Sequence, residues 1–126
     1  MLNGLFGKEF KVGPEKKNMI GFNLRGLLAG GNRLTPIDEG ASVARGEAVY
    51  LWEARYTEKR ADYWRLDTRL SYHLNGQRST HTISLDIQNV TNRQNIFGTY
   101  YDVQTQKIET IYQNGLIPIL NYRLEF

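Results

Sequence analysis

The charged residues best placed for chemistry fall in two neighbouring segments. Arg65, Asp67 and Arg69 alternate with apolar residues in one segment, and Asp86 lies in the next. Such a group could imitate a charged catalytic site. Because alternation directs these side chains to one face of a sheet, we expect instead a ladder of ion pairs and hydrogen bonds.

The other candidates for catalysis or metal binding are weak. His73 and His81 are predicted on opposite faces of the sheet, so they do not share a metal ion. Cysteine is absent, which excludes disulfides, thiolate nucleophiles and zinc–thiolate clusters. No GxSxG, HExxH or P-loop motif appears. We therefore expect no enzyme activity, no catalytic or metal-binding residue and no cofactor.

The composition bears on whether the protein binds nucleic acid and whether it lies in a membrane. The net charge is +3, but 16 basic residues are scattered among 13 acidic ones, so we expect no nucleic-acid partner. Mean hydropathy is −0.51. This value does not decide the question of a membrane, because a membrane-spanning strand with every second residue apolar is mildly polar on average. The aromatic content of 12% suits β-structure and the aromatic belts of membrane proteins.

The clearest element is an amphipathic strand over 63–74. The residues at even positions are Trp64, Leu66, Thr68, Leu70, Tyr72 and Leu74, and those at odd positions are Tyr63, Arg65, Asp67, Arg69, Ser71 and His73. Twelve residues of this alternation make a strand about twice the usual length in soluble sheets.

A hairpin is predicted next. Asn75-Gly76 favours a two-residue turn, because both residue types tolerate positive φ. With that loop, Leu70 would face His81 and Leu66 would face Leu85 in the alternating segment 80–90. Both apolar sets then share one face of the sheet.

The remaining elements follow the same pattern. Five strands are predicted, at 2–12, 18–29, 61–74, 80–90 and 116–126. Short turns alternate along the chain with long, polar and aromatic connections over about 30–62 and 92–115. In a meander, the short turns then lie at one end of the sheet and the long loops at the other. Outer-membrane barrels have this asymmetry.

The fold class predicted is all-β, an antiparallel meander of about five long strands that is part of a transmembrane β-barrel. Its lipid side should carry Trp64, Leu66, Leu70, Tyr72, Ile83, Leu85, Ile87, Leu120, Tyr122, Leu124 and Phe126. The alternative is a soluble β-barrel or sandwich with the apolar face inward, acting as a binding module. Loops of more than about 20 residues are uncommon in compact soluble domains of this size.

Several segments resemble the C-terminal end of TonB-dependent outer-membrane receptors of the Bacteroidetes type. These are 84–95, which includes Asn89-Val90-Thr91-Asn92, together with 100–102, 115–126 and the loop segment 30–38. Residues 86–95 and the aromatic C-terminal strand are the most specific parts. The resemblance covers nearly the whole chain.

The resemblance implies a barrel of about 22 strands with a plugged lumen. Such a receptor imports a scarce nutrient, for example a siderophore or a glycan, with energy from TonB. Residues 1–126 would be a C-terminal portion of that barrel, without a plug and without an export signal of its own. We expect this portion to be a fragment or truncated product that is inert for transport by itself. The alternative within membrane proteins is a passive or structural barrel without a plug.

Partners and location follow from the same resemblance. The expected location is the bacterial outer membrane, and the expected partners are outer-membrane lipid, the rest of the barrel and its plug, and the barrel assembly machinery. TonB would be reached only through the missing N-terminal part. The candidate substrate-contact residues in the loops are Tyr50, Trp52, Tyr100 and Tyr101, and the alternative is that these aromatic residues pack on one another for purely structural reasons. The strand expected to act as the assembly signal carries Pro118, Leu120, Tyr122, Leu124 and Phe126.

Overall fold

The computed structural model describes all 126 residues and is all-β, with 58% strand and 10% helix. The chain forms two compact units. The first comprises Met1–Leu28, Trp64–Arg93 and Gly115–Phe126, and the second comprises Ala29–Tyr63 and Gln94–Asn114. No helix in the structure is both long enough and apolar enough to cross a membrane.

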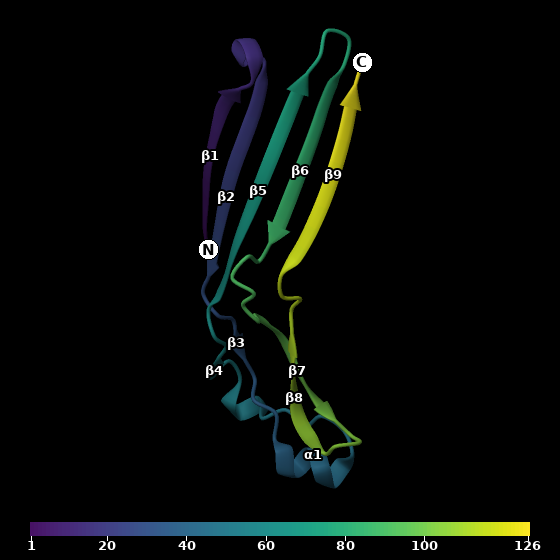
Figure 1. Ribbon diagram of the computed structural model, residues 1–126. Helices are drawn as coiled ribbons and strands as arrows, with labels where there is room; N and C mark the ends of the chain where they lie inside the picture. Colours follow the sequence, from purple (N-terminus) through teal and green to yellow (C-terminus); the bar gives the residue numbers. More distant parts are fainter. The chain divides into compact units, whose positions relative to one another are not determined.

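The first unit is one antiparallel sheet of five strands (Figure 1). Its strands are β1 (Leu2–Val12), β2 (Asn18–Ala29), β5 (Tyr63–Asn75), β6 (Thr80–Gln88) and β9 (Ile117–Glu125). Their order in the sheet, β1-β2-β5-β6-β9, is that of a meander. The predicted all-β meander of five long strands is therefore confirmed. The sheet is open, with β1 and β9 as its edges.

The short turns lie at one end of this sheet. A 3₁₀ turn, η1 (Pro14–Lys16), joins β1 to β2 after Gly13, whose φ of 81° favours glycine. Residues 76–79 join β5 to β6, and the Gly76 amide donates to the Ser79 carbonyl at 2.9 Å. Both long connections leave from the opposite end, as the order of turns predicts.

The predicted register of the β5–β6 hairpin is wrong by four residues. Leu70 pairs with Leu85 rather than with His81, because Asn75 remains in the strand and pairs with Thr80. The Asn75 side chain helps to hold this residue in the strand, since its amide nitrogen donates to the Lys17 carbonyl at 2.5 Å. A shift of four leaves every side chain on its predicted face, because the strand period is two.

The two faces of the sheet differ sharply in charge. The even positions of β1, β2, β5 and β9 share a face with the odd positions of β6. All the residues predicted on the lipid side lie there, and Lys8 is the one charged residue on that face. The opposite face carries the charged residues Glu9, Lys11, Arg25, Arg65, Asp67, Arg69, Asp86, Arg123 and Glu125.

The apolar face is not covered by a second layer. Leu120 is 74% exposed and Leu70 is 55% exposed, although both lie within long strands. In the whole chain, Leu27 and Tyr101 are the only buried hydrophobic residues. A soluble sheet normally buries one face against another layer, so this sheet lacks the core that would stabilise it in water.

The two long connections, predicted only as polar and aromatic, contain short regular elements and make up the second unit. It contains two short antiparallel pairs, β3 (Arg33–Leu34) with β4 (Glu58–Lys59) and β7 (Ile96–Asp102) with β8 (Lys107–Tyr112). It also contains the helix α1 (Glu39–Arg45) and a 3₁₀ turn, η2 (Trp52–Ala54). These elements satisfy backbone groups that an irregular loop would leave to water.

Helix α1 begins and ends at residues suited to those positions. The Asp38 carboxylate caps the start by accepting from the Ala41 amide at 3.0 Å, and Gly46 ends the helix with a φ of 67°. Ser42 is fully buried, and its hydroxyl oxygen accepts from the Val49 amide at 2.9 Å. The helix is thereby fixed to the chain that follows it.

Candidate functional site

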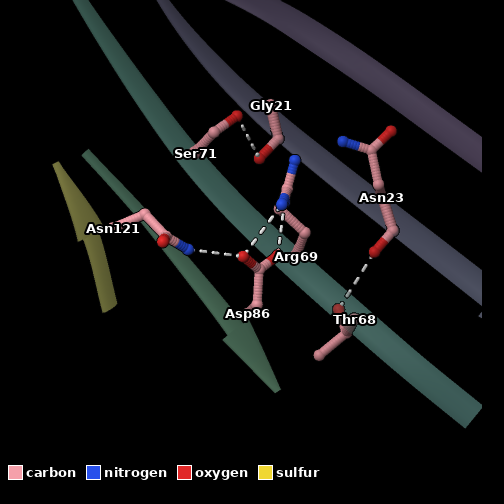
Figure 2. Close-up of polar contacts among 7 residues, drawn as sticks. All are labelled: Gly21, Asn23, Thr68, Arg69, Ser71, Asp86 and Asn121. Atoms are coloured by element: carbon pink, nitrogen blue, oxygen red, sulfur yellow. Dashed lines mark hydrogen bonds and ion pairs between the residues drawn. The ribbon is translucent and has the colours of Figure 1, made fainter. Parts of the chain in front are cut away.

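The centre of the polar face is an ion-pair ladder across three strands. Arg69 on β5 pairs directly with Asp86 on β6, and the Arg69 guanidinium donates to both carboxylate oxygens, with a distance of 2.9 Å from Nη2 to Oδ2. From β9, the Asn121 side-chain amide donates to the same Oδ2 at 2.8 Å. Figure 2 shows the Arg69 and Asn121 side chains converging on the Asp86 carboxylate. The ladder therefore links β5, β6 and β9.

Two hydroxyl groups tie β5 to β2, Ser71 on the face of the ladder and Thr68 on the opposite face. Thr68 Oγ1 donates to the Asn23 carbonyl at 3.2 Å, and Ser71 Oγ donates to the Gly21 carbonyl at 3.5 Å (Figure 2). A Cβ atom at Gly21 would collide with Ser71 Oγ, so glycine gives this hydroxyl its space.

A second polar cluster lies where β6 ends. Arg65 donates to Asp67 Oδ2 at 2.8 Å, while Asp67 Oδ1 accepts from the Asn89 amide at 2.9 Å. Asn89 is 2% exposed and adopts a φ of 51°, and its side-chain amide exchanges hydrogen bonds with the backbone of Arg93. Nearby, Asn92 Oδ1 accepts from the Leu116 amide at 2.9 Å. This cluster, which we call the asparagine clasp, joins the ends of β5, β6 and β9.

These groups have the chemistry of a polar wall. The Asp86 carboxylate is held by Arg69 and Asn121, and the Asp67 carboxylate by Arg65 and the Asn89 amide. The face is hollowed around them, and the hollow is lined also by Arg25 and Gln88. Partners that fix each carboxylate in place suit a structural role facing water or a second polar surface.

The histidines lie on opposite faces, as predicted. His73 contacts Thr82 Oγ1 on the polar face at 3.0 Å, and His81 contacts the Tyr122 hydroxyl on the apolar face at 2.8 Å. The two imidazoles therefore do not form one site.

The loop aromatics predicted to contact substrate divide into exposed and buried residues. Tyr50 and Trp52 are 43% and 69% exposed, and their rings lie 5.8 Å apart with an interplanar angle of 47°. Tyr100 is 45% exposed on β7, whereas Tyr101 is 7% exposed and packs inside the second unit. The structure thus brings Tyr50 and Trp52 together as an open aromatic pair and leaves Tyr101 inaccessible.

Backbone hydrogen bonds hold the segment that carries Tyr50 and Trp52. Ile37 and Tyr50 form an isolated antiparallel bridge, and the Leu51 amide donates to the Pro36 carbonyl at 2.9 Å. Trp52 opens the 3₁₀ turn η2. The aromatic rings are consequently presented by an ordered segment.

The predicted assembly strand is β9, an edge strand. Leu120, Tyr122 and Leu124 lie on the apolar face with exposures of 74%, 61% and 38%, and Phe126 follows with full exposure. Pro118 pairs with Ile87, and proline is tolerated in edge strands.

Comparisons of the chain with protein families, with curated proteins and with solved structures found no match. The sequence did not predict three roles. The side chains of Asn89 and Asn92 bind backbone groups in the asparagine clasp, and the buried Ser42 hydroxyl accepts from the Val49 amide. Asn in a run of turn-forming residues is the signal that could have indicated the first two, because Asn tolerates positive φ and binds nearby backbone groups.

Proposed function

We propose that this chain is a wall segment of an outer-membrane active-transport receptor that imports a scarce nutrient with TonB energy. The observation that carries the proposal is the contrast between the two faces of this sheet of long strands. The apolar side chains of one face are exposed, whereas the polar side chains of the other face are hydrogen-bonded to one another. Lipid would cover the first face, and the second would line the lumen. Alternation of this kind is the pattern of transmembrane barrels.

The open edges support a larger barrel. An unpaired strand edge in hydrocarbon leaves amides and carbonyls without partners, and each such group costs several kcal/mol. β1 and β9 would therefore pair with further strands of the same barrel. The rest of the barrel and its plug, outer-membrane lipid and, through the plug-bearing part, TonB are the partners in this proposal.

The exposed loop aromatics fit the outer end of such a wall. Tyr50, Trp52 and Tyr100 present accessible rings, which suit contact with a glycan or a chelate. Tyr101 would support Tyr100 from inside the second unit, because it is buried on the same strand.

The experiment that tests active import against a passive barrel is a swelling assay. The full barrel-forming protein would be reconstituted in phosphatidylcholine vesicles, with the trisaccharide raffinose as the permeating probe. A plugged receptor excludes raffinose, so we expect no swelling. Rapid swelling would contradict the proposal and favour the passive barrel.

A second experiment tests recognition by the barrel assembly machinery. Alternate side chains of an added strand can fill pockets on an exposed edge, so we expect Phe126→Ala to lower the amount of assembled protein in the outer membrane. Glu125→Gln, on the opposite face, is the matched control and should leave that amount unchanged. Equal assembly of both variants would leave Phe126 as an ordinary lipid-facing residue.

A further inference from the structure

A groove crosses the apolar face near the strand ends that lead to the long connections. Its lining includes Leu2 and Gly4 of β1, Gly26 and Leu28 of β2, and Trp64 and Leu66 of β5. Gly4 and Gly26 are paired neighbours in the sheet. Neither presents a side chain, so the layer of apolar side chains is interrupted there.

The floor of the groove is open space. A Cβ atom at Gly4 would meet nothing within 4 Å, and one at Gly26 would meet only the Leu66 Cδ1 atom at 4.0 Å. Neither glycine has a positive φ, so the backbone does not demand glycine at these positions. The gap is therefore available to an apolar chain lying against Trp64 and Leu66.

A positively charged side chain, that of Arg93, packs against the Trp64 indole that lines the groove. The Arg93 guanidinium lies over the Trp64 ring, 5.1 Å from its centroid. Asn89 fixes the Arg93 backbone, donating to its carbonyl at 2.8 Å and accepting from its amide at 3.2 Å. Asn89 therefore fixes the backbone of Arg93, and the Trp64 ring packs against its guanidinium. A guanidinium forms strong charge-assisted hydrogen bonds with a phosphate.

We propose that this groove and Arg93 form a site for one lipid with an anionic phosphate headgroup. An acyl chain would lie over Gly4 and Gly26, and the phosphate would meet Arg93 at the strand end. The charge of Arg93 selects the headgroup, since an uncharged or zwitterionic lipid gains less from it. The site rests on the proposed membrane location of this face.

The test uses Trp64 as the reporter. The full barrel-forming protein is used, with Trp52→Phe and with any tryptophan outside residues 1–126 replaced, so that Trp64 is the remaining tryptophan. The protein would be placed in phosphatidylcholine vesicles that contain a minor fraction of either phosphatidic acid or phosphatidylcholine with brominated acyl chains, which quench nearby indole fluorescence. We expect brominated phosphatidic acid to occupy the site with about fivefold preference over brominated phosphatidylcholine.

Arg93→Gln tests the role of the Arg93 charge, and Gly26→Leu tests the role of the groove. Arg93→Gln should abolish the preference while quenching by brominated phosphatidylcholine remains, whereas Arg33→Gln in the second unit should leave the preference intact. Gly26→Leu should fill the groove and weaken the preferential quenching without disturbing the sheet. Equal quenching by the two lipids, or a preference that survives Arg93→Gln, would overturn the lipid site. Absence of quenching by both lipids would instead overturn the membrane location on which the site rests.

Discussion

A single arginine placed on either side of β9 gives the sharpest prediction. Leu120 and Ile119 are neighbours in sequence, but Leu120 lies on the apolar face and Ile119 lies on the polar face opposite Asp86. Leu120→Arg and Ile119→Arg therefore make similar changes of residue type on opposite faces. In a bilayer, only Leu120→Arg puts a new charge in hydrocarbon.

The expected loss of stability for Leu120→Arg depends on how deep position 120 lies in the bilayer. Leu120 pairs with Leu85, one residue from the centre of the nine-residue strand β6, so position 120 lies close to the middle of the span. Arginine on the lipid face near the bilayer midplane costs about 2–4 kcal/mol. Because Leu120 is 74% exposed, little packing within the chain is lost, and nearly all of this cost comes from the lipid. Ile119→Arg should change stability by at most about 1 kcal/mol, since the new charge faces Asp86.

The assay is denaturant unfolding of the full barrel-forming protein folded in phosphatidylcholine vesicles, followed by tryptophan fluorescence. We expect a loss of about 2–4 kcal/mol in the free energy of unfolding for Leu120→Arg and a small change for Ile119→Arg. Equal effects of the two substitutions, or a larger effect of Ile119→Arg, would refute the assignment of the two faces.

Two further predictions concern the second unit. Gly31→Ala should destabilise it by about 1–3 kcal/mol, because the new Cβ would collide with the backbone carbonyl of Arg60, while Gly30→Ala meets open space and should be nearly neutral. Thermal unfolding of both variants, monitored by near-ultraviolet circular dichroism, makes the comparison, and equal midpoints would contradict it. Ser42→Ala should destabilise the same unit by about 1–3 kcal/mol, because the part-buried Val49 amide loses the acceptor that the buried Ser42 hydroxyl provides. Hydrogen exchange at the Val49 amide should accelerate, and unchanged exchange would show that this bond contributes little.

The strands were predictable because alternation is a strong local signal. From Trp64 to Leu74 every second side chain except Thr68 is apolar, and tertiary contacts could reinforce that pattern without needing to override it. The faces followed directly from parity. The exact register did not, because Asn75-Gly76 shows where the chain can turn but does not fix the length of the loop.

The long connections were less predictable. Helix α1 is seven residues long, and its apolar pattern is too short to stand out, although Asp38 and Gly46 are suitable capping residues. The exposure of the loop aromatics also lay beyond the sequence. Tyr100 and Tyr101 are adjacent and of one type, and only the pairing of β7 with β8 directs one outward and the other inward.

The central claim is that one face of this sheet contacts lipid and the other does not. Residues 1–126 contain no cysteine, so single cysteines introduced into the full barrel-forming protein, freed of any other cysteine, can carry spin labels at successive positions of β9 in phosphatidylcholine vesicles. The measurement is the accessibility of each label to oxygen, which concentrates in hydrocarbon, and to a water-soluble nickel complex. We predict that labels at Leu120, Tyr122 and Leu124 favour oxygen, and that labels at Asn121 and Arg123 favour nickel. Accessibility without this period of two, or nickel access at Leu120 equal to that at Asn121, would contradict the account.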